Sequence, residues 1–526
     1  MYSIMQIPIL TSSTLDTIPN NTLVKCVGMV QDMFNPEYFV SEYKDSSGNW
    51  RTTRYGDDVA GDIVEGCETK FDERHPMLVV PIPACSPWMM DKTEADAFES
   101  IQQFQVGVSQ MREKRSLDTD DMAVDDQSNK PVQDVTTGNT SSIMVDGSTT
   151  PHGAKKAPVE QPVNDAKAPT IENQLENIPH GSCVVHIYDG SGGVKLNDMV
   201  EVVGVLSRVP GLAPYDAMDE DHEGIASKIP TSVAPRVHAI SISKLSSPCP
   251  EPHTPLDSST IQQARAQTKE FLAALLGGDE VAAEYLLIQI ISRVHMRTQD
   301  SGASALGTMP MNLTGLPDKS SGFVQELSNA LSLLLPSLKF LALDIDSLNK
   351  SPWYPCKLQN QAFLSVAPLQ LPAGTVVLLD ETAMTAGQLT ETGLKNLGAI
   401  QTMMQFQKLP YDFQFYQLDQ PTDQPIIIMS VGKTMLHGAG EIHVPLKPAP
   451  SSLQNGNEIP SVAHLSKKLD LNLVRQYISL VRHLEFSIPQ DMEQEIEKDM
   501  TQARKKDASN VNAATFHCWL NVRCFC

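Results

Sequence analysis

Short apolar runs separated by turn residues fill the first 84 positions of the chain. Between residues 22 and 84 they read TLVKCVGMV, EYFVSEY, WRTTRY and MLVVPIP, with a Ser-Ser-Gly turn at 46–48. Alternation of apolar and polar residues with a period of two is typical of strands that bury one face. The pattern therefore predicts a small β-rich domain whose first part lies within residues 1–89.

A second group of strand-like runs follows far downstream, and it reads CVVHIYD, MVEVVGVLS and RVHAISIS between about 183 and 243. Residues 23–30 and 199–206 share one order: apolar, Val, charged, apolar, Val, Gly, apolar, apolar. A glycine inside a strand marks a bulge or tight bend, which a small closed barrel of the OB (oligonucleotide/oligosaccharide-binding) type requires. We predict that residues 179–250 complete an OB-like β-barrel; coincidence between two short apolar strands is the alternative.

The tract between the two β segments, residues 90–178, is rich in Asp, Ser, Thr, Gln, Asn and Pro and holds no aromatic residue after Phe104. Such a composition buries too little apolar surface to offset the entropy of ordering, so we predict a disordered acidic and polar linker. Within it Arg112, Lys114 and Arg115 form a candidate nuclear-import signal. Because four-residue basic runs are common, a solvated basic turn is the alternative.

From about residue 257 helical segments alternate with short apolar strands, which is typical of an α/β domain. The segment EVAAEYLLIQIISRVHMR is apolar around most of its circumference, and Asp279 precedes it as an N-cap, so we predict a buried helix. The runs TMPMNLTG, KFLALDI, TVVLLDE and QPIIIMS suit central strands of a covered sheet. We place the α/β domain at 257–460 and a C-terminal helical region at 461–526, with two helices between about 465 and 506.

The strongest motif for chemistry is VVLLDE at 376–381, an apolar strand that ends in Asp380 and Glu381 like a Walker B motif. Nucleotide hydrolysis also needs a P-loop, GxxxxGK[ST], whose amides and lysine hold the phosphates. Aligned from Gly278, the chain has Glu284 in place of that lysine. A carboxylate there repels phosphate.

A second P-loop candidate is the triplet Gly432, Lys433, Thr434, which follows an apolar strand. The position five before Gly432 is Ile427 where the pattern needs glycine, and the triplet comes after Asp380 in chain order, opposite to P-loop ATPases. We therefore predict a Walker B-like remnant without a working P-loop. No catalytic residue and no cofactor are expected, and the chain is predicted not to be an enzyme.

Other reactive-looking groups lack the context that chemistry needs. Asp189 opens an Asp-Gly-Ser-Gly-Gly stretch that sits between two β segments and is interpreted as a turn. Nine scattered cysteines favour a reducing compartment. No zinc spacing is present, so no metal site is predicted. The nearest approach to one is a cluster of His517, Cys518, Cys524 and Cys526.

The formal net charge of -23 disfavours capture of a polyanion by a broad basic surface, so direct DNA binding is not expected. The longest apolar stretches fall well short of the roughly 20 residues that span a bilayer, and the start has no basic region ahead of its apolar run. We expect neither membrane insertion nor secretion.

The chain resembles the mini-chromosome maintenance (MCM) complex-binding protein family along most of its length, in the order and spacing of several stretches. These are VGMVQDMFNPEYFVSEY at 27–43, KRSLDTDDM at 114–122, NDMVEVVGVLS at 197–207, LLGGDEVAAEYLLIQIISRV at 275–294, VVLLDETAMTAGQL at 376–389, LPYDFQFYQ at 409–417 and LVRHLEFSI at 480–488. Relative to the family, the chain starts close to the first β region and stops before a basic tail. Either the gene model is incomplete or this member is shorter, and both alternatives stay open.

The resemblance implies a nuclear, non-enzymatic partner of MCM helicase subunits that looks like a catalytically degenerate AAA-like relative of them. It implies roles in DNA replication, in unloading MCM complexes from chromatin or chaperoning their assembly, and in sister-chromatid cohesion during mitosis and cell division. Two alternatives stay open. An active AAA-type ATPase would bind nucleotide in a titration, and a single-strand DNA-binding OB protein would retain DNA in a filter assay at low salt.

Overall fold

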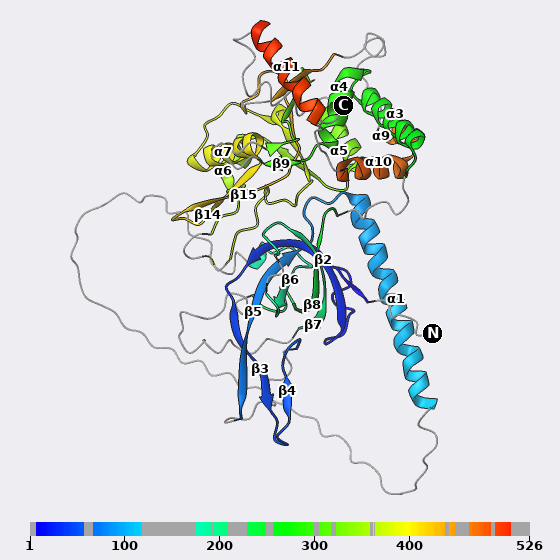
Figure 1. Cartoon of the computed structure of the whole chain (residues 1–526), viewed down its shortest axis with the longest axis vertical. Helices are drawn as coiled ribbons and strands as arrows, with labels where there is room; N and C mark the ends of the chain where they lie inside the picture. Colours follow the sequence, from blue (N-terminus) through cyan, green and yellow to red (C-terminus); the bar gives the residue numbers. More distant parts are fainter. Residues whose placement is uncertain are drawn as a thin grey trace, which may run out of the picture.

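The computed structural model describes most of the chain in two units, a β-rich unit and an α/β unit, stacked along its longest axis (Figure 1). The described residues are 7–56, 67–117, 175–190, 193–208, 229–248, 256–297, 305–316, 322–357, 361, 363–436, 441–447, 462–484 and 490–506. The mixed α/β composition agrees with the predicted fold class.

The β-rich unit is one mixed sheet built from both sides of the long insertion. Its strands are β1 (Ile9–Leu10), β2 (Leu23–Met33), β3 (Glu37–Lys44), β4 (Trp50–Thr52), β5 (Thr69–Val80), β6 (Cys183–Ile187), β7 (Met199–Ser207) and β8 (Arg236–Leu245). The pairings run β2–β7–β8–β6–β5 and return from β5 to β2, so these five strands pair in a ring. The outer parts of β3, β4 and β5 project from the ring as an extension (Figure 1). Each strand predicted here from the sequence is confirmed.

Gly28 and Gly204, the glycines of the two similar stretches, lie where neighbouring backbones approach closely. β2 and β7 pair antiparallel, so that Gly28 faces Val200 and Val24 faces Gly204. A Cβ on Gly204 would lie 2.3 Å from the His238 carbonyl oxygen, and the β7–β8 register shifts at that point. The predicted irregularity is confirmed at Gly204, and its cause is the lack of room for any side chain.

The α/β unit is built on a five-stranded parallel sheet in the order β12-β13-β16-β11-β17. Its strands are β11 (Met311–Thr314), β12 (Leu338–Ala342), β13 (Val376–Asp380), β16 (Ile426–Met429) and β17 (Ile442–Pro445). Two small antiparallel pairs accompany this sheet. They are β9 (Met296–Arg297) with β10 (Ala305–Leu306), and β14 (Lys408–Asp412) with β15 (Gln417–Pro421). The four runs predicted as central strands form β11, β12, β13 and β16, so the strands are confirmed. β12 lies at the edge of the sheet, so its predicted central position is wrong. Because the strands are parallel, their carboxyl ends share one edge.

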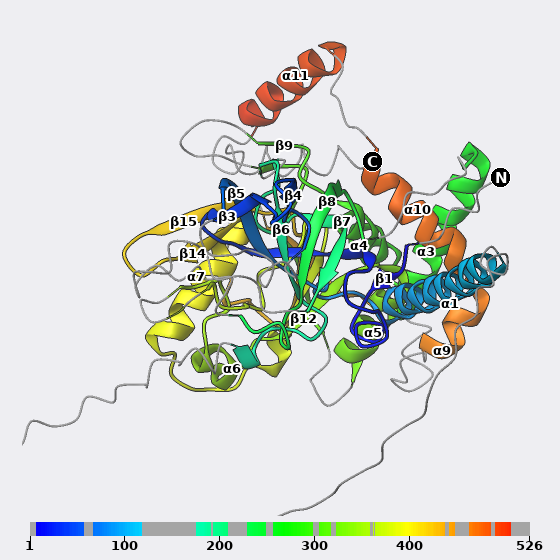
Figure 2. The same cartoon turned by 90° about the horizontal axis from the view of Figure 1, so that it is seen from below.

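Helices cover both faces of this sheet. The helices of this part of the chain are α3 (Ser258–Leu275), α4 (Glu280–Ile291), α5 (Phe323–Leu334), α6 (Ile345–Lys350), α7 (Glu391–Phe406), α9 (Val462–Leu465), α10 (Leu471–His483) and α11 (Gln490–Lys506). Leu378 of β13 packs among α3, α4, α5 and α10, whereas its neighbour Leu379 packs with Ile400 of α7. α11 stands apart from the sheets in Figure 2. The covered sheet explains why its strands are continuous apolar runs.

Asp279 caps α4 as predicted, because its carboxylate accepts hydrogen bonds from the N–H groups of Val281 and Ala282. Eight of the twelve residues of α4 are buried, which confirms the predicted burial. The helix ends at Ile291, earlier than the sequence pattern predicts. Ser292 takes an extended backbone with ψ of 148°, and the chain then enters β9.

A long helix, α1 (Pro87–Leu117), occupies the first part of the stretch predicted to be disordered. Ala97 and Ser100 are 0% and 3% exposed, and the Trp88 indole N–H donates to backbone carbonyls at the end of α5. The prediction of disorder is thus wrong for this segment, since a few well-spaced contacts anchor a helix whose composition is polar. Residues 118–174 of the predicted linker lie outside the described residues.

The two units meet at the end of β2. The Gln31 side chain donates to the Leu364 carbonyl, and the Leu364 N–H donates to the Asp32 carboxylate, 2.8 Å away. Phe363, which is 2% exposed, packs among ring side chains such as Met29. These contacts join the α/β unit to the outer face of the ring.

Candidate functional site

The carboxyl edge of the parallel sheet carries the predicted acidic pair. Asp380, 5% exposed, ends β13 and accepts hydrogen bonds from the N–H and hydroxyl of Thr382. Glu381 accepts from the Thr434 hydroxyl at 2.7 Å and from the Met435 N–H at 3.0 Å. Burial raises the pKa of Glu381, and these hydrogen bonds act in the opposite direction. Both carboxylates follow an apolar strand, as predicted from the sequence, and donors of the chain itself already hold them.

The triplet Gly432, Lys433, Thr434 lies beside this pair, in the loop that follows β16. Thr434 is buried and contacts Glu381, whereas Gly432 and Lys433 are exposed. A P-loop runs from a strand into a helix N-terminus, so that backbone amides point at the phosphates. Residues 430–436 form no helix, so the triplet has a different setting from a P-loop.

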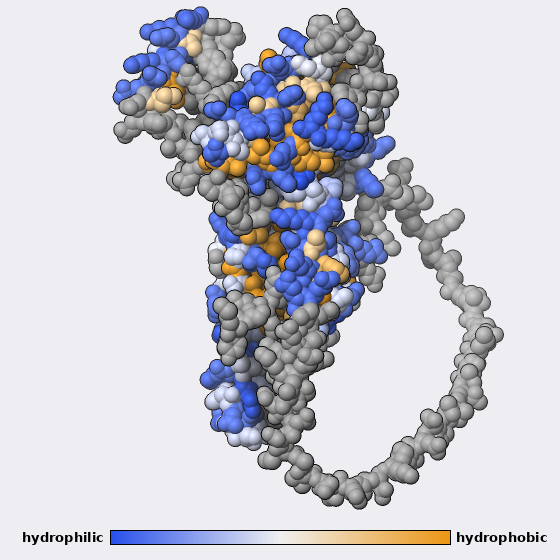
Figure 3. All heavy atoms as spheres, turned by 90° about the vertical axis from the view of Figure 1, so that its right-hand side faces the viewer, coloured by the Kyte–Doolittle hydropathy of each residue, from blue (hydrophilic) through white to orange (hydrophobic). Residues whose placement is uncertain are grey.

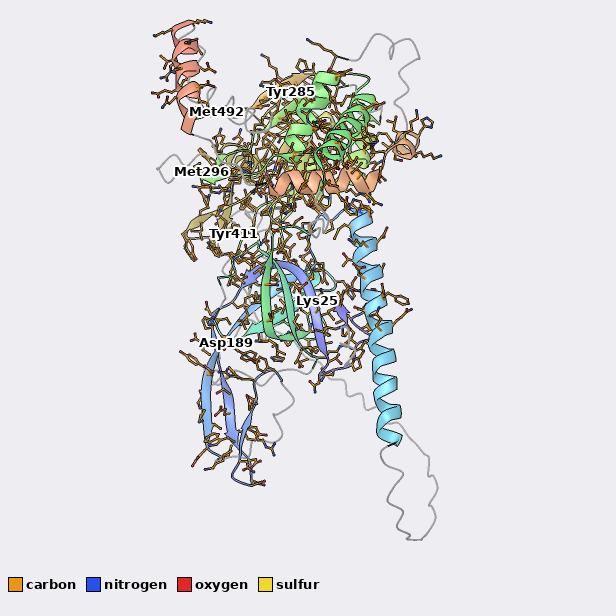
Figure 4. All side chains as sticks on the ribbon, turned by 45° about the vertical axis from the view of Figure 1, so that its right-hand side comes forward. Lys25, Asp189, Tyr285, Met296, Tyr411 and Met492 are labelled. Atoms are coloured by element: carbon orange, nitrogen blue, oxygen red, sulfur yellow. The ribbon has the colours of Figure 1, made fainter. Side chains whose placement is uncertain are left out.

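The structure places Glu284 away from the sheet edge, which corrects the alignment made from the sequence. Gly278 belongs to the turn between α3 and α4, where no strand precedes it. Glu284 is on α4 and pairs with Arg265 and Lys269 of α3, the latter at 3.2 Å. Figure 4 shows the adjacent Tyr285 among the helices at the top of the α/β unit. Glu284 therefore does not occupy the position of a P-loop lysine.

The connection between β11 and α5 is another place where a strand of this sheet is followed by a helix. It leaves the interior strand β11 and enters α5, and Gly315 and Gly322 at its ends have φ of 73° and 69°. Aligned on GxxxxGK[ST] from Gly315, the chain has Ser320 at the second glycine and Ser321 at the lysine. Residues 317–321 lie outside the described part, so this alignment concerns sequence alone. Local periodicity missed the loop because the strand order was needed to find it.

The hairpin of β14 and β15 presents large apolar side chains to solvent. Phe415 is 80% exposed, Tyr416 62% and Leu418 47%. The Tyr416 ring stacks on Phe413 with 4.9 Å between centroids. Clustered exposed aromatic side chains are typical of contact sites for other proteins. We call Phe415, Tyr416 and Leu418 the hairpin tip.

The base of this hairpin is fixed to both units. Tyr411 of β14 is fully buried, and its hydroxyl donates to the Asn197 side chain of the β-rich unit at 2.9 Å. The Asp412 N–H donates to the Pro355 carbonyl at 3.0 Å. Figure 4 places Tyr411 at the junction of the two units. The hairpin tip is therefore held by a rigid base, which lowers the entropy cost of using it for binding.

A second exposed aromatic cluster lies on the extension of the ring. The Lys70 ammonium lies 4.3 Å from the centroid of the Trp50 ring, and the Lys44 ammonium 6.0 Å from it. Both lysines also pair with carboxylates, Lys70 with Glu42 at 2.6 Å and Lys44 with Glu68 at 3.1 Å. The acidic partners reduce the positive charge that this cluster offers to a ligand.

The remaining sequence predictions fall on less informative places. Asp189 is an 82% exposed side chain in the turn after β6, 3.8 Å from Arg54. Arg112, Lys114 and Arg115 belong to the last turns of α1, where side chains are not described, and the segment with His517 and Cys518, Cys524 and Cys526 lies outside the described residues. Within the described ranges, no three His, Cys, Asp or Glu side chains gather as a metal site, and no helix is long and apolar enough to cross a membrane.

Comparisons with known proteins cover nearly the whole chain. The family model described as "Mini-chromosome maintenance replisome factor" matches residues 2–525. A mini-chromosome maintenance complex-binding protein of Arabidopsis thaliana is 32% identical over 96% of this chain and 84% of its own length. Proteins of the same name from Danio rerio and Homo sapiens are 29% and 28% identical over 97% and 98% of this chain, and over 85% and 86% of their own lengths. The chain therefore belongs to the mini-chromosome maintenance replisome factor family.

Proposed function

We propose that this chain is a non-enzymatic binding partner of MCM helicase subunits. The observation that carries the proposal is the near full-length match to relatives named MCM complex-binding proteins. Family, order of stretches and length of the match all support one shared role for the whole chain. A direct test is to titrate the purified chain with single MCM subunits and to measure each dissociation constant.

The architecture behind this proposal is an OB-type barrel followed by a degenerate AAA-like domain. The ring of five strands supports the first part, and the parallel sheet with Asp380 and Glu381 after β13 supports the second. The loop after β11 has Ser321 where a P-loop has its lysine, which removes the main side-chain donor to a nucleotide phosphate. Glu381 is bound by Thr434, an arrangement that suits a structural residue.

The hairpin tip is the surface that we assign to the MCM contact. A few rigid aromatic side chains carry most of the free energy of a typical protein interface, and truncation of one such residue costs about 2 kcal/mol or more. At about 1.4 kcal/mol for each factor of ten, Phe415→Ala should weaken binding roughly 30-fold. Phe415 is 80% exposed, so the same change should leave the stability of the free chain almost unaltered.

The matched control is Phe71→Ala on β5, because Phe71 is also an exposed aromatic residue, at 46%, but lies on the extension of the ring. Binding of one MCM subunit by both variants and the unchanged chain should be compared in one titration series. A loss confined to Phe415→Ala supports the assignment. Equal affinity of Phe415→Ala and the unchanged chain would move the contact elsewhere.

The proposed action is to shift MCM assembly toward the dissociated form, by competition at a subunit interface in the nucleus. A binder shifts such an equilibrium only through different affinities for free and assembled subunits, and it needs no ATP turnover. This action would unload MCM complexes from chromatin or chaperone newly made MCM subunits. By either route it would support sister-chromatid cohesion. If purified chain bound helicase rings and left them intact at saturation, this mechanism would fail.

A second candidate function, binding of single-stranded DNA, is favoured by one feature, the placement of Trp50 beside Lys44 and Lys70. Aromatic side chains among basic residues form stacking platforms for bases. The net charge of -23 and the acidic partners of both lysines oppose it. Filter binding at low salt decides between the two, and Trp50→Ala should abolish retention only if the DNA function is real.

A further inference from the structure

A cavity lies at the amino edge of the parallel sheet, opposite the edge that carries Asp380. The loops that precede β12, β13 and β16 line it together with α10, the start of α1 and the end of β8. Its volume is about 80 Å³, which is room for a small group such as a single oxyanion.

Charges in this cavity are strongly unequal. Three guanidinium groups line it, those of Arg293, Arg475 and Arg482, against one carboxylate, Asp423. We call this site the arginine cavity. Within the described residues, neither Arg293 nor Arg482 lies within 4 Å of a carboxylate oxygen. Asp423 compensates the positive charge of Arg482 and Arg293 only in part, because one carboxylate faces several guanidinium groups. Partly compensated cations at a partly buried site are costly, so a bound anion would stabilise them.

The guanidinium groups are oriented by backbone contacts. An Nη2 of Arg482 donates to the Gly374 carbonyl at 2.6 Å, and the Nε of Arg475 donates to the Leu333 carbonyl at 2.8 Å. Arg475 also lies over the Trp88 ring, 3.9 Å from its centroid. Each of these contacts uses only part of the five donors of a guanidinium. The guanidinium groups of Arg475 and Arg482 are therefore oriented before any ligand arrives, while the Nε of Arg293 lies 3.5 Å from the Nδ1 of His295.

A polar atom of the cavity lining also lacks a partner. The Ser479 hydroxyl, one turn before His483 on α10, is buried and has no hydrogen-bond partner among the described residues. A buried hydroxyl without a partner costs about 1–3 kcal/mol. Such a group is an independent sign of a ligand atom, because an oxyanion beside it would accept its hydrogen bond.

We propose that the arginine cavity binds a phosphate-class oxyanion, either as the free ion or as a phosphomonoester. Arg293 and Arg482 supply the charge, and the Ser479 hydroxyl supplies a neutral donor. Arginine forks match the geometry of phosphate oxygens. Asp423 opposes the anion, but its carboxylate accepts the Val294 N–H at 2.9 Å and is outnumbered by the cations. The site is independent of the MCM contact at the hairpin tip.

The test is calorimetric titration of the full chain with inorganic phosphate and, separately, with O-phosphoserine, at constant ionic strength. We expect saturable binding to one site. Arg482→Gln should weaken it at least about tenfold, in line with loss of a charge-assisted hydrogen bond. Ser479→Ala should weaken it several-fold and is the safer variant, since it removes only a hydroxyl without a partner. The matched control is Arg51→Gln, an exposed arginine on β4, which should bind as the unchanged chain does.

The two ligands distinguish the sources of the oxyanion. Tighter binding of O-phosphoserine points to a phosphorylated side chain, whereas binding of inorganic phosphate alone points to the free ion. Absence of saturable heat with both ligands would overturn the proposal. The proposal would also be overturned if Ser479→Ala and Arg293→Gln bound both ligands as tightly as the unchanged chain does. This outcome can be read even if Arg482→Gln fails to fold.

Discussion

Replacement of Asp32 by Asn should change how the stability of the chain depends on pH. Asp32 is 5% exposed where the two units meet, and its oxygens accept from the N–H groups of Leu364 and Met33, each at 2.8 Å. Burial raises the pKa of Asp32 to about 6, and those two donors and Lys357 act in the opposite direction. The folded chain therefore keeps this proton at pH values where the unfolded chain has lost it.

The sign and the size of the effect follow from this difference. Below pH 3.8 the Asp32 carboxyl is protonated in both states, so it contributes no pH dependence. Between 3.8 and about 6 the folded state binds more protons, so the free energy of unfolding falls as pH rises. At about 1.4 kcal/mol for each pKa unit, the full loss is about 3 kcal/mol, and it is constant above pH 6.

The assay is urea unfolding of the unchanged chain and of Asp32→Asn at a series of pH values between about 4 and 7. Asn keeps one acceptor and does not titrate, so its lost hydrogen bond adds only a constant offset. Other groups cancel when the two free energies of unfolding are subtracted. We predict that the stability of the unchanged chain relative to the variant falls by about 2 to 3 kcal/mol over this range. A difference that is flat or rises with pH would refute the burial argument.

Three further substitutions test separate parts of the structure by urea unfolding. Gly204→Ala should cost about 2 kcal/mol or more, because its Cβ would lie 2.3 Å from a backbone oxygen. Glu37→Gln should lower the free energy of unfolding by about 3 kcal/mol, because it removes the carboxylate that pairs with Arg74. The Glu37 oxygen lies 3.3 Å from the Nε of Arg74, and both side chains are at most 10% exposed. Thr434→Val should cost about 1 to 2 kcal/mol, because the carboxylate of Glu381 loses a donor.

Each of these has its own control. Gly56→Ala should be nearly neutral, since nothing lies within 4 Å of a Cβ there. Lys70→Gln removes one side of an exposed ion pair and should cost at most about 1 kcal/mol, in contrast to the buried pair. Lys433→Gln changes the exposed neighbour of Thr434 and should leave stability unaltered. If a control variant lost as much free energy of unfolding as the test variant with which it is matched, the corresponding packing argument would be contradicted.

Strands were predictable from this sequence because their signal is local. The strand-forming residues at 37–43 and the continuous apolar run at 376–379 lie between turn residues, and β3 and β13 form there. In β3 the polar residues Glu37 and Ser41 are buried and Tyr38 is exposed, so the sequence predicted the strand but not its buried face. The glycine in residues 199–206 likewise marked a real close approach. Period and turn residues were sufficient for these elements, since no distant contact competes with them.

Features that depend on distant contacts were not predictable in the same way. α1 has a polar composition, and it becomes ordered through contacts of side chains such as Trp88 with α5. The connection from β11 to α5 was identified from the strand order, which no local pattern encodes. Exposure of Phe415 and Tyr416 appears only once Tyr411 is seen to bury the base of their hairpin. The carboxylates at the end of β13 could be found in advance, but not the loop that holds Glu381.

The central claim, binding to MCM subunits, is tested most directly by affinity capture of the tagged full chain from a nuclear extract of its own cells, followed by mass spectrometry. The same capture with Phe415→Ala serves as the comparison. We predict that the unchanged chain recovers several MCM subunits, and that the variant recovers far less of them. Recovery of no MCM subunit by the intact, folded chain would contradict the account.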